Sequence, residues 1–200
     1  MSKNDLLTWP NALSTLRIFL TPLFVLLLFT EVWYLKSMAF VVFVVAAVTD
    51  FFDGRLARSS DRITPLGRFL DPLADKILVT AALLAFVWGG RVHVWLVVPV
   101  IVRDVVITGL RLYSIYHGRE LATSQLAKWK TATQLFAVVI ILLCISLQGF
   151  LERFDWLRVV PLDDDAIQLL SNGLMGAVLL LTVLSGLHYL FRSNFTFNKS

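Results

Sequence analysis

Four aspartates lie close together in the chain at spacings that suit a metal-dependent site. Asp50 and Asp53 are three residues apart, and Asp71 and Asp75 are four apart. On a helix, either spacing places both side chains of the pair on one face.

The chemistry of these side chains suits a metal ion. Carboxylate oxygens without nearby His or Cys favour magnesium, manganese or calcium over zinc. Two such ions about 3.5–4 Å apart are used for displacement at phosphorus, so the spacing predicts this kind of site.

Small residues and one arginine accompany the aspartates. Gly54, Ala57 and Gly67 remove bulk where a nucleotide or a diphosphate would press against the backbone. Arg58 adds a planar fork of donors for a phosphate. The alternative is that the aspartates only pair with neighbouring basic residues at the membrane surface. Such pairs contribute little and need no glycines, so we favour a binding site.

The elements that carry these residues have the composition of a membrane protein. Of the 200 residues, 58% are hydrophobic and 16% are charged, and the mean hydropathy is +0.76. A soluble domain has about 45–50% apolar and about 25% charged residues. Apolar runs of about 17–25 residues predict an all-α polytopic membrane protein with six transmembrane helices. After a short interfacial N-terminal segment, we expect a single domain over residues 1–200 with spans near 13–34, 37–58, 69–88, 92–117, 128–149 and 168–191.

The connection between the second and third predicted spans is about ten residues long, which makes these two helices antiparallel neighbours and lets the four aspartates converge. The net charge of +4 suits an anionic leaflet better than nucleic acid, and we find no nucleic-acid motif. Cys144 is the single cysteine, which excludes an intrachain disulfide.

The basic residues predict the orientation of the chain. Lys and Arg in short loops are retained in the cytoplasm during insertion. Ten of them fall on the side of the two termini, against four on the other side. We therefore expect both termini and the 54–68 connection in the cytoplasm. The acidic 150–166 segment would face outward, with its acids solvated.

The aspartate motif resembles the signature of the CDP-alcohol phosphotransferase family, D-x2-D-G-x2-A-R-x8-G-x3-D-x3-D, with all eight fixed positions and every spacing kept. The resemblance implies an enzyme that transfers a phosphoalcohol from a CDP-linked donor to a second alcohol and releases CMP. It implies two divalent cations, Mg²⁺ or Mn²⁺, and Asp75 as the base. The metal ligands would be Asp50, Asp53, Asp71 and Asp75. The CDP-diacylglycerol site would contain Asn11, Ser14, Gly54, Ala57, Arg58, Thr64 and Gly67.

Three further stretches resemble the bacterial phosphatidylglycerophosphate synthases within this family. They are residues 10–17, the pair Arg103-Asp104 with Arg111, and residues 124–134. That subfamily often has Gly-Lys-x-Lys-Thr in the last stretch, where this chain has Ala127 in place of the glycine. The resemblance implies glycerol 3-phosphate as the acceptor, membrane lipids as the surroundings, the bacterial inner membrane as the location, and a homodimer.

The basic residues in the later spans suit an acceptor that carries its own phosphate. Arg103 lies deep in a hydrophobic span, where a charge is costly, and Arg111 is about 12 Å further along the same helix. Lys128 and Lys130 are about 200° apart on an ideal helix, so both cannot point at one phosphate unless the helix begins after them. We expect a glycerol-phosphate site formed by Arg103, Arg111, Lys128 and Lys130. The alternatives are pairing of Arg103 with Asp104 or another acid, and simple membrane anchoring by the lysines.

Two other functions stay open from the sequence. One is a sister activity, such as a cardiolipin, phosphatidylserine or phosphatidylinositol phosphate synthase. The other is a divalent-cation transporter, whose carboxylates would mark an ion path. The outer halves of the second and third spans, residues 38–48 and 80–88, hold almost no polar residues, which favours the enzyme.

Overall fold

The structure is a computed structural model of the chain. It describes the backbone of residues 9–59, 65–116, 125–155 and 162–197. Within these ranges it describes the side chains except those of residues 9–14, 50–59, 65–73 and 188–197 and of Asp75, Arg111 and Ile115.

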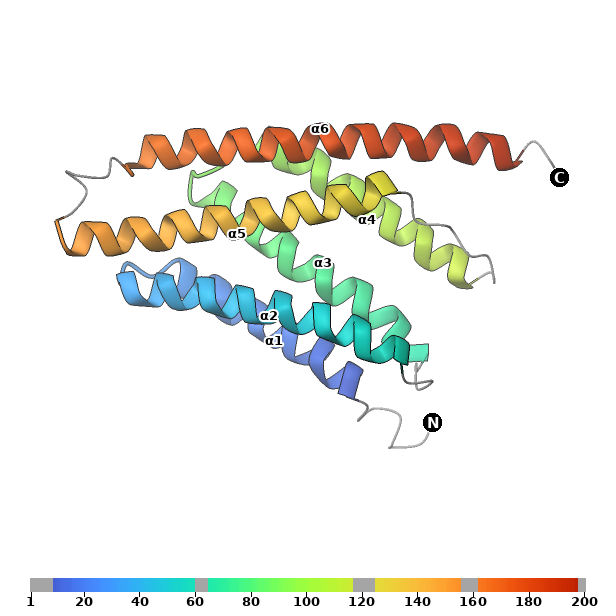
Figure 1. Cartoon of the computed structure of the whole chain (residues 1–200), viewed down its shortest axis with the longest axis horizontal. Coiled ribbons are helices and arrows are strands. Elements are labelled where there is room, and N and C mark those ends of the chain that lie inside the picture. The colour runs from blue at the N-terminus through green and yellow to red at the C-terminus, as the bar shows by residue number, and fades with distance from the viewer. Residues whose placement is uncertain (1–8, 60–64, 117–124, 156–161, 198–200) are drawn as a thin grey trace. The chain divides into compact units, whose positions relative to one another are not determined.

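The described backbone forms six helices and contains no strand (Figure 1). The helices are α1 (Trp9–Leu28), α2 (Trp33–Ser59), α3 (Pro65–Trp88), α4 (Val94–Tyr116), α5 (Gln125–Arg153) and α6 (Asp164–Phe197). Each helix overlaps one predicted span, so the all-helical class and the order of helices are confirmed.

The predicted end of the first span is wrong. That span was expected to reach residue 34, but α1 ends at Leu28 and α2 begins at Trp33. The hydroxyl of Thr30 donates to the carbonyl of Leu27 at 2.7 Å, and the Thr30 N–H donates to the same carbonyl at 3.4 Å. These bonds satisfy a carbonyl at the helix end. Thr30 and Glu31 are the polar signal of this break, but Phe29 and Val32 on either side of them keep the apolar run long enough to include the turn.

The chain divides into two compact units. Unit 1 comprises Met1–Ala85 with Leu142–Asp163, and unit 2 comprises Phe86–Ile141 with Asp164–Ser200. Helices α3 and α5 contribute residues to both units. The single domain expected from the sequence stays a prediction.

In unit 1, α1 packs against α2 through one stripe on each helix. Phe24 of α1 and Phe43 of α2 are fully buried, with their ring centroids 5.4 Å apart. The buried positions on α1 are Arg17, Thr21, Phe24 and Leu28, and those on α2 are Ala39, Phe43 and Ala46. Spacings of three and four residues keep each set on one helix face. The four-residue connection from 29 to 32 makes the two helices antiparallel.

The last turns of α5 also belong to unit 1, where they contact the start of α2. The hydroxyl of Ser146 donates to the hydroxyl of Ser37 at 2.8 Å. The Trp33 ring lies 5.9 Å from the Phe150 ring. A Cβ atom on Gly149 would lie 3.3 Å from the Cβ of Trp33, so the glycine permits this close approach.

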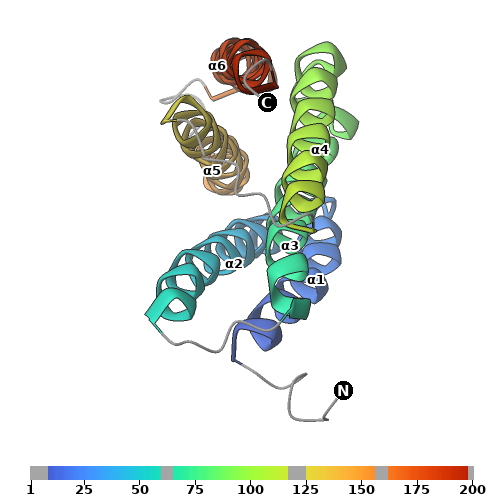
Figure 2. The ribbon, with the colours of Figure 1, turned by 90° about the vertical axis from the view of Figure 1, so that its right-hand side faces the viewer.

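In unit 2, α4 packs against α6 (Figure 2). The buried positions on α4 include Val97, Val100 and Asp104, and those on α6 are Ile167, Ser171, Met175, Val178, Thr182 and Ser185. Both stripes are mainly apolar at their first turns and become polar further along. Helix packing therefore positions Asp104 and Ser185 inside unit 2.

The turn between α3 and α4 has the geometry of a Schellman motif. Gly90 has a φ of +70°, and its N–H donates to the carbonyl of Val87 at 3.1 Å. The N–H of Arg91 donates to the carbonyl of Phe86 at 2.9 Å. This pair of bonds requires the left-handed conformation that glycine adopts without strain.

The start of α6 holds this turn in place. Gln168 donates to the carbonyl of Gly90 at 2.8 Å, and Asn172 accepts from the N–H of His93 at 2.9 Å. Arg91 also pairs with Asp164, which lies in the first turn of α6. Asp164 thus has an ion-pair partner, whereas the sequence predicted only solvated acids in this segment. An acid in the first turn also complements the helix dipole.

Two helices among the described residues are long and apolar enough to cross a membrane, Gln125–Arg153 and Asp164–Leu187. Shorter apolar stretches cover Thr15–Leu28, Trp33–Thr49 and Lys76–Trp88. Large apolar side chains are exposed along the helices, among them Phe19, Leu26, Val105, Leu169 and Leu180. Apolar surface of this extent suits a lipid environment. The six-span topology stays a prediction.

Candidate functional site

The aspartate motif lies on two helices of unit 1. Asp50 and Asp53 are in α2, and Asp71 and Asp75 are in α3. The same helices contain Gly54, Ala57, Arg58 and Gly67. The helical backbone that the spacing argument requires is therefore present at both aspartate pairs.

The side chains of these motif residues lie outside the described ones, as does the whole of Thr64. Among the His, Cys, Asp and Glu side chains that are described, no three gather into a group that could hold a metal ion. The four aspartates are not part of that set. Metal binding by Asp50, Asp53, Asp71 and Asp75 therefore stays a prediction.

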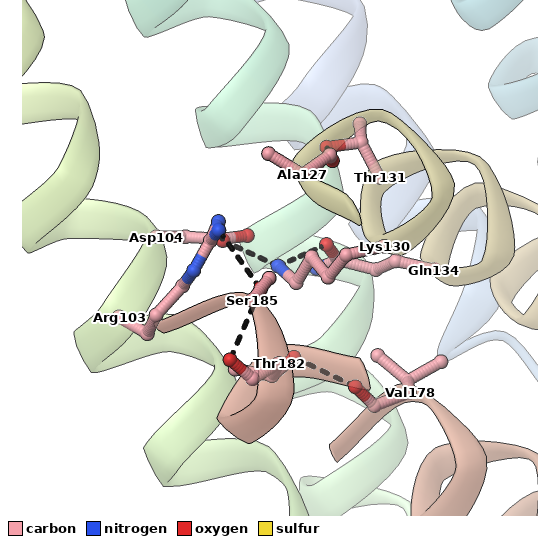
Figure 3. Close-up of polar contacts among 9 residues, drawn as sticks. All are labelled: Arg103, Asp104, Ala127, Lys130, Thr131, Gln134, Val178, Thr182 and Ser185. Atoms are coloured by element: carbon pink, nitrogen blue, oxygen red, sulfur yellow. Dashed lines mark hydrogen bonds and ion pairs between the residues drawn. The ribbon is translucent and has the colours of Figure 1, made fainter. Parts of the chain in front are cut away.

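A second group of predicted site residues meets inside unit 2. Arg103 and Asp104 of α4, Lys130 and Gln134 of α5, and Ser185 of α6 form one hydrogen-bonded network, called here the Asp104 cluster (Figure 3). Three consecutive helices thus bring polar side chains to one place.

Lys130 is the most deeply buried member of the cluster. Its ammonium group donates to Oδ1 of Asp104 and, at 2.7 Å, to Oε1 of Gln134. Lys130 is 0% exposed and Asp104 is 4% exposed. Charges at this depth are tolerated only when they are paired and hydrogen-bonded. Asp104 and Lys130 can therefore be buried only because they contact each other.

Arg103 contacts the same carboxylate from the other side. Its Nη1 lies 3.2 Å from Oδ1 of Asp104, and its Nη2 donates to Oγ of Ser185 at 3.0 Å. Ser185 in turn donates to the carbonyl of Thr182 at 3.1 Å. Nε of Arg103 is buried and has no hydrogen-bond partner in the described part of the chain. A buried N–H without a partner costs about 1–3 kcal/mol, so this atom is a candidate donor to a ligand.

The charges of the cluster favour an anion. Its described side chains include two cations, Arg103 and Lys130, and one carboxylate, Asp104, which leaves an excess of one positive charge. A guanidinium and an ammonium together bind phosphate by charge-assisted hydrogen bonds. The arrangement is therefore chemically suited to a phosphate-bearing molecule.

Of the other two predicted acceptor residues, Lys128 has a described side chain, and it lies outside this network. α5 begins at Gln125, before both lysines, so Lys128 and Lys130 point in different directions as their spacing requires. Lys128 is exposed, whereas Lys130 is buried. The side chain of Arg111 in α4 lies outside the described ones, as do those of Asn11 and Ser14 in α1.

Several polar residues of unit 2 had not been predicted as site residues. Asp104 belongs to one of the stretches that resemble the synthases, but the role expected for it was only that of an alternative partner for Arg103. An acid in an apolar span needs a cation, and Lys130 and Gln134 are four residues apart on a helix; both are signals in the sequence. The pairing of Arg103 with Ser185 joins residues 82 positions apart and has no such signal.

Unit 1 contains a further buried charge. Arg17 of α1 is 3% exposed, and the Thr21 hydroxyl donates to its carbonyl at 2.9 Å. A basic residue within an apolar helix is itself a signal of function, because burial of a charge is costly.

The chain matches the family model described as CDP-alcohol phosphatidyltransferase over residues 7–186. Curated relatives carry the name CDP-diacylglycerol–glycerol-3-phosphate 3-phosphatidyltransferase. The relative from Pseudomonas fluorescens is 39% identical over 139 residues, which cover 66% of this chain and 71% of the relative. The relative from Cereibacter sphaeroides is 37% identical, covering 70% of this chain and 65% of the relative. The relative from Bacillus subtilis is 35% identical, covering 67% and 76%.

Proposed function

Since the chain belongs to the CDP-alcohol phosphatidyltransferase family, we propose that it transfers the phosphatidyl group of CDP-diacylglycerol to glycerol 3-phosphate and releases CMP. The observation that carries this proposal is the agreement among relatives. Three of them, at 35–39% identity, are named for this donor and this acceptor. The product is phosphatidylglycerophosphate, so the chain is a membrane transferase of phospholipid biosynthesis.

The four aspartates form the metal site of the proposed reaction. Asp50 and Asp53 of α2, with Asp71 and Asp75 of α3, supply only carboxylate oxygens, the ligands that Mg²⁺ and Mn²⁺ prefer. This donor set suits two ions, because four carboxylates exceed the need of one. When bound, the ions neutralise the diphosphate and stabilise the charge on the departing CMP.

Asp75 is the base of the proposed mechanism and takes the proton from the acceptor hydroxyl. The hydroxyl oxygen forms a bond to the lipid-side phosphorus. The bond from that phosphorus to the CMP oxygen breaks on the opposite side, and CMP leaves with the electron pair. Arg58 donates hydrogen bonds to the diphosphate. The donor lipid is bound by Asn11, Ser14, Gly54, Ala57, Arg58, Thr64 and Gly67.

The phosphate of glycerol 3-phosphate binds to basic residues of α4 and α5. Arg103 and Lys130 are the central pair, and their support is the excess positive charge of the Asp104 cluster together with the buried Nε of Arg103. Arg111 and Lys128 add positive charge on the same two helices. The pairing of Lys130 with Asp104 does not oppose this role, because two cations and one carboxylate among the described side chains of the cluster still give a net positive charge.

The bacterial inner membrane is the proposed location, with six spans and with both termini and the active site on the cytoplasmic side. The excess of Lys and Arg on that side supports this orientation. The diacyl donor then enters sideways from the inner leaflet, and the water-soluble acceptor enters from the cytoplasm.

The test is CMP release by the purified full-length protein in detergent or vesicles. With Mg²⁺ and CDP-diacylglycerol, it should release CMP when glycerol 3-phosphate is added, and chelation of the metal should stop the release. Serine, inositol phosphate and phosphatidylglycerol serve as comparison acceptors and should give only background. CMP release with one of these acceptors and not with glycerol 3-phosphate would assign a sister activity instead.

A further inference from the structure

Asp104 contacts both central basic residues through one oxygen atom. Oδ1 of Asp104 accepts from Nζ of Lys130 and from Nη1 of Arg103 (Figure 3). Arg103 is its neighbour on α4, whereas Lys130 comes from α5. The carboxylate therefore lies between two cations from different helices, and it fixes the distance between them.

Arg103 and Lys130 require such a group because their like charges repel. Both side chains are long and have many rotamers, so without a shared anion they would separate. Gln134 also contacts Lys130, but its amide is neutral and cannot offset the repulsion. Asp104 is the carboxylate that the described side chains place at both cations.

The hydrogen bonds of Arg103 leave its Nε–H as a donor for a ligand. Nη1 donates to Asp104 and Nη2 donates to Ser185, so residues of α4 and α6 fix the plane of the guanidinium group. Nε stays buried and without a partner among the described residues. Arginine binds a phosphate best when its fork of donors is held in a fixed orientation.

We propose that Asp104 is the positioning residue of the acceptor site: it holds Arg103 and Lys130 together so that both meet the phosphate of the acceptor. This inference rests on the proposed function. Asp104 does not touch the substrate in this role, because a carboxylate would repel the phosphate. Asp104 acts through the two cations. Because it already holds their side chains in place, less conformational entropy is lost when the acceptor binds.

The experiment compares two substitutions at Asp104 with a matched control. Asp104→Asn removes the charge at nearly constant volume, and Asp104→Glu keeps the charge on a longer side chain. Asp164→Asn is the control, since it breaks an exposed ion pair of the same unit. For each variant we would measure kcat, the KM for each substrate, and the midpoint of thermal unfolding.

In Asp104→Asn we expect the KM for glycerol 3-phosphate to rise about tenfold or more. A loss of this size is common when a residue that orients the binding groups is removed. The KM for CDP-diacylglycerol should change by less than about twofold. Asp104→Glu should recover part of the loss. Inorganic phosphate, used as a competing anion, should inhibit Asp104→Asn more weakly, with the inhibition constant rising in parallel with the acceptor KM. Asp164→Asn should behave like the wild type.

Each contrary result has a distinct meaning. A folded Asp104→Asn variant with an unchanged acceptor KM would overturn the positioning role. An equal rise in both KM values with a lower unfolding midpoint would also overturn it, because that pattern indicates a structural role. If Asp104→Asn does not fold, Asp104→Glu decides: a KM for CDP-diacylglycerol that rises as much as the KM for glycerol 3-phosphate rejects the proposal. A wild type that releases no CMP with glycerol 3-phosphate overturns the proposed function, and this inference with it.

Discussion

Two ion pairs of unit 2 differ in what they contribute to the molecule. Arg91 pairs with Asp164, whose side chain is 73% exposed, and such surface pairs contribute about 0–1 kcal/mol. Asp104 and Lys130 are almost fully buried. Removing one partner of a buried pair costs about 3–5 kcal/mol, because the other charge is left uncompensated. The Asp104 cluster is therefore where a single side chain can change both stability and function.

Replacing Asp75 by asparagine should nearly abolish turnover. The change removes the proposed base and one negative metal ligand, and a general base alone contributes about 10²–10⁴-fold. We expect kcat to fall at least about 10³-fold. CMP release measures kcat, and circular dichroism checks that the variant keeps its helices. Asp165→Asn, an exposed acid at the start of α6, is the control. Wild-type rates in Asp75→Asn would show that the proton goes elsewhere.

Replacing Arg103 by alanine should act on acceptor binding. The variant loses the donors that we assign to the acceptor phosphate, so the KM for glycerol 3-phosphate should rise by about tenfold or more, while the KM for CDP-diacylglycerol stays near the wild-type value. Steady-state kinetics with each substrate varied in turn measures both. Arg153→Ala changes an exposed arginine at the end of α5 and should leave both constants unchanged. An unaltered acceptor KM in Arg103→Ala would leave this residue with only its contacts to Asp104 and Ser185.

At the level of residues, the sequence contains the motif but not the cluster. The spacing from Asp50 to Asp75 is a local pattern, and helix geometry alone relates each pair of aspartates. Arg103 stands out because a charge in an apolar span is costly. Its contact with Ser185 depends on how α4 packs against α6, which no local pattern encodes.

At the level of elements, the apolar runs locate the helices well but not their ends. α5 extends from residue 125 to 153, where the predicted span covered 128–149, and α6 extends from 164 to 197, where the predicted span covered 168–191. The backbone hydrogen bonds of a helix continue through polar residues at its ends, whereas a span predicted from hydropathy ends where the polar residues begin. Hydrogen bonds at the helix ends decide where a helix stops, and the bond from the Thr30 hydroxyl to the carbonyl of Leu27 does so after α1.

The turn after α3 gives a test at this scale. Gly90→Ala places a Cβ atom on a residue with a φ of +70°, which should destabilise the protein by about 1–2 kcal/mol. The midpoint of chemical or thermal unfolding in detergent measures the loss. Gly109→Ala is the matched control: Gly109 lies within α4 and an added Cβ meets nothing within 4 Å, so alanine should be neutral or stabilise by about 0.5–1 kcal/mol. Equal stability of the two variants would contradict the strain assigned to Gly90.

At the level of the whole molecule, exposed apolar side chains and basic residues act together. Large apolar residues on the helix surfaces suit lipid contact, and the excess of Lys and Arg at one side of the predicted spans orients them. Composition is therefore enough to predict a membrane protein, whereas the orientation derived from charge asymmetry stays a prediction. The arrangement of helices within each unit depends on packing and cannot be derived from either.

Cysteine labelling tests the orientation. In a chain with Cys144 replaced by serine, Glu152→Cys should react with a membrane-impermeant maleimide in intact cells, because the proposed orientation places the 150–166 segment outside. Ser200→Cys should react only after the membrane is made permeable, because the same orientation places the C-terminus in the cytoplasm. The fraction of labelled protein, read from a gel shift, is the measurement. Labelling of Ser200→Cys in intact cells would reverse the proposed orientation.

The contacts of α4 have a consequence for biosynthesis. If α4 crosses the membrane, as we propose, Arg103 and Asp104 each cost roughly 2.5–3.5 kcal/mol at the centre of the span, or about 5–7 kcal/mol together when unpaired. Their contact with each other is present within α4 itself, but Lys130 follows Asp104 by 26 positions and Ser185 follows Arg103 by 82. A ribosome that has released only the first four helices has not yet produced these partners. In the proposed six-span topology, the fourth helix is therefore least stable in the bilayer while translation is under way, and we expect the insertion machinery to retain it until the last helix emerges.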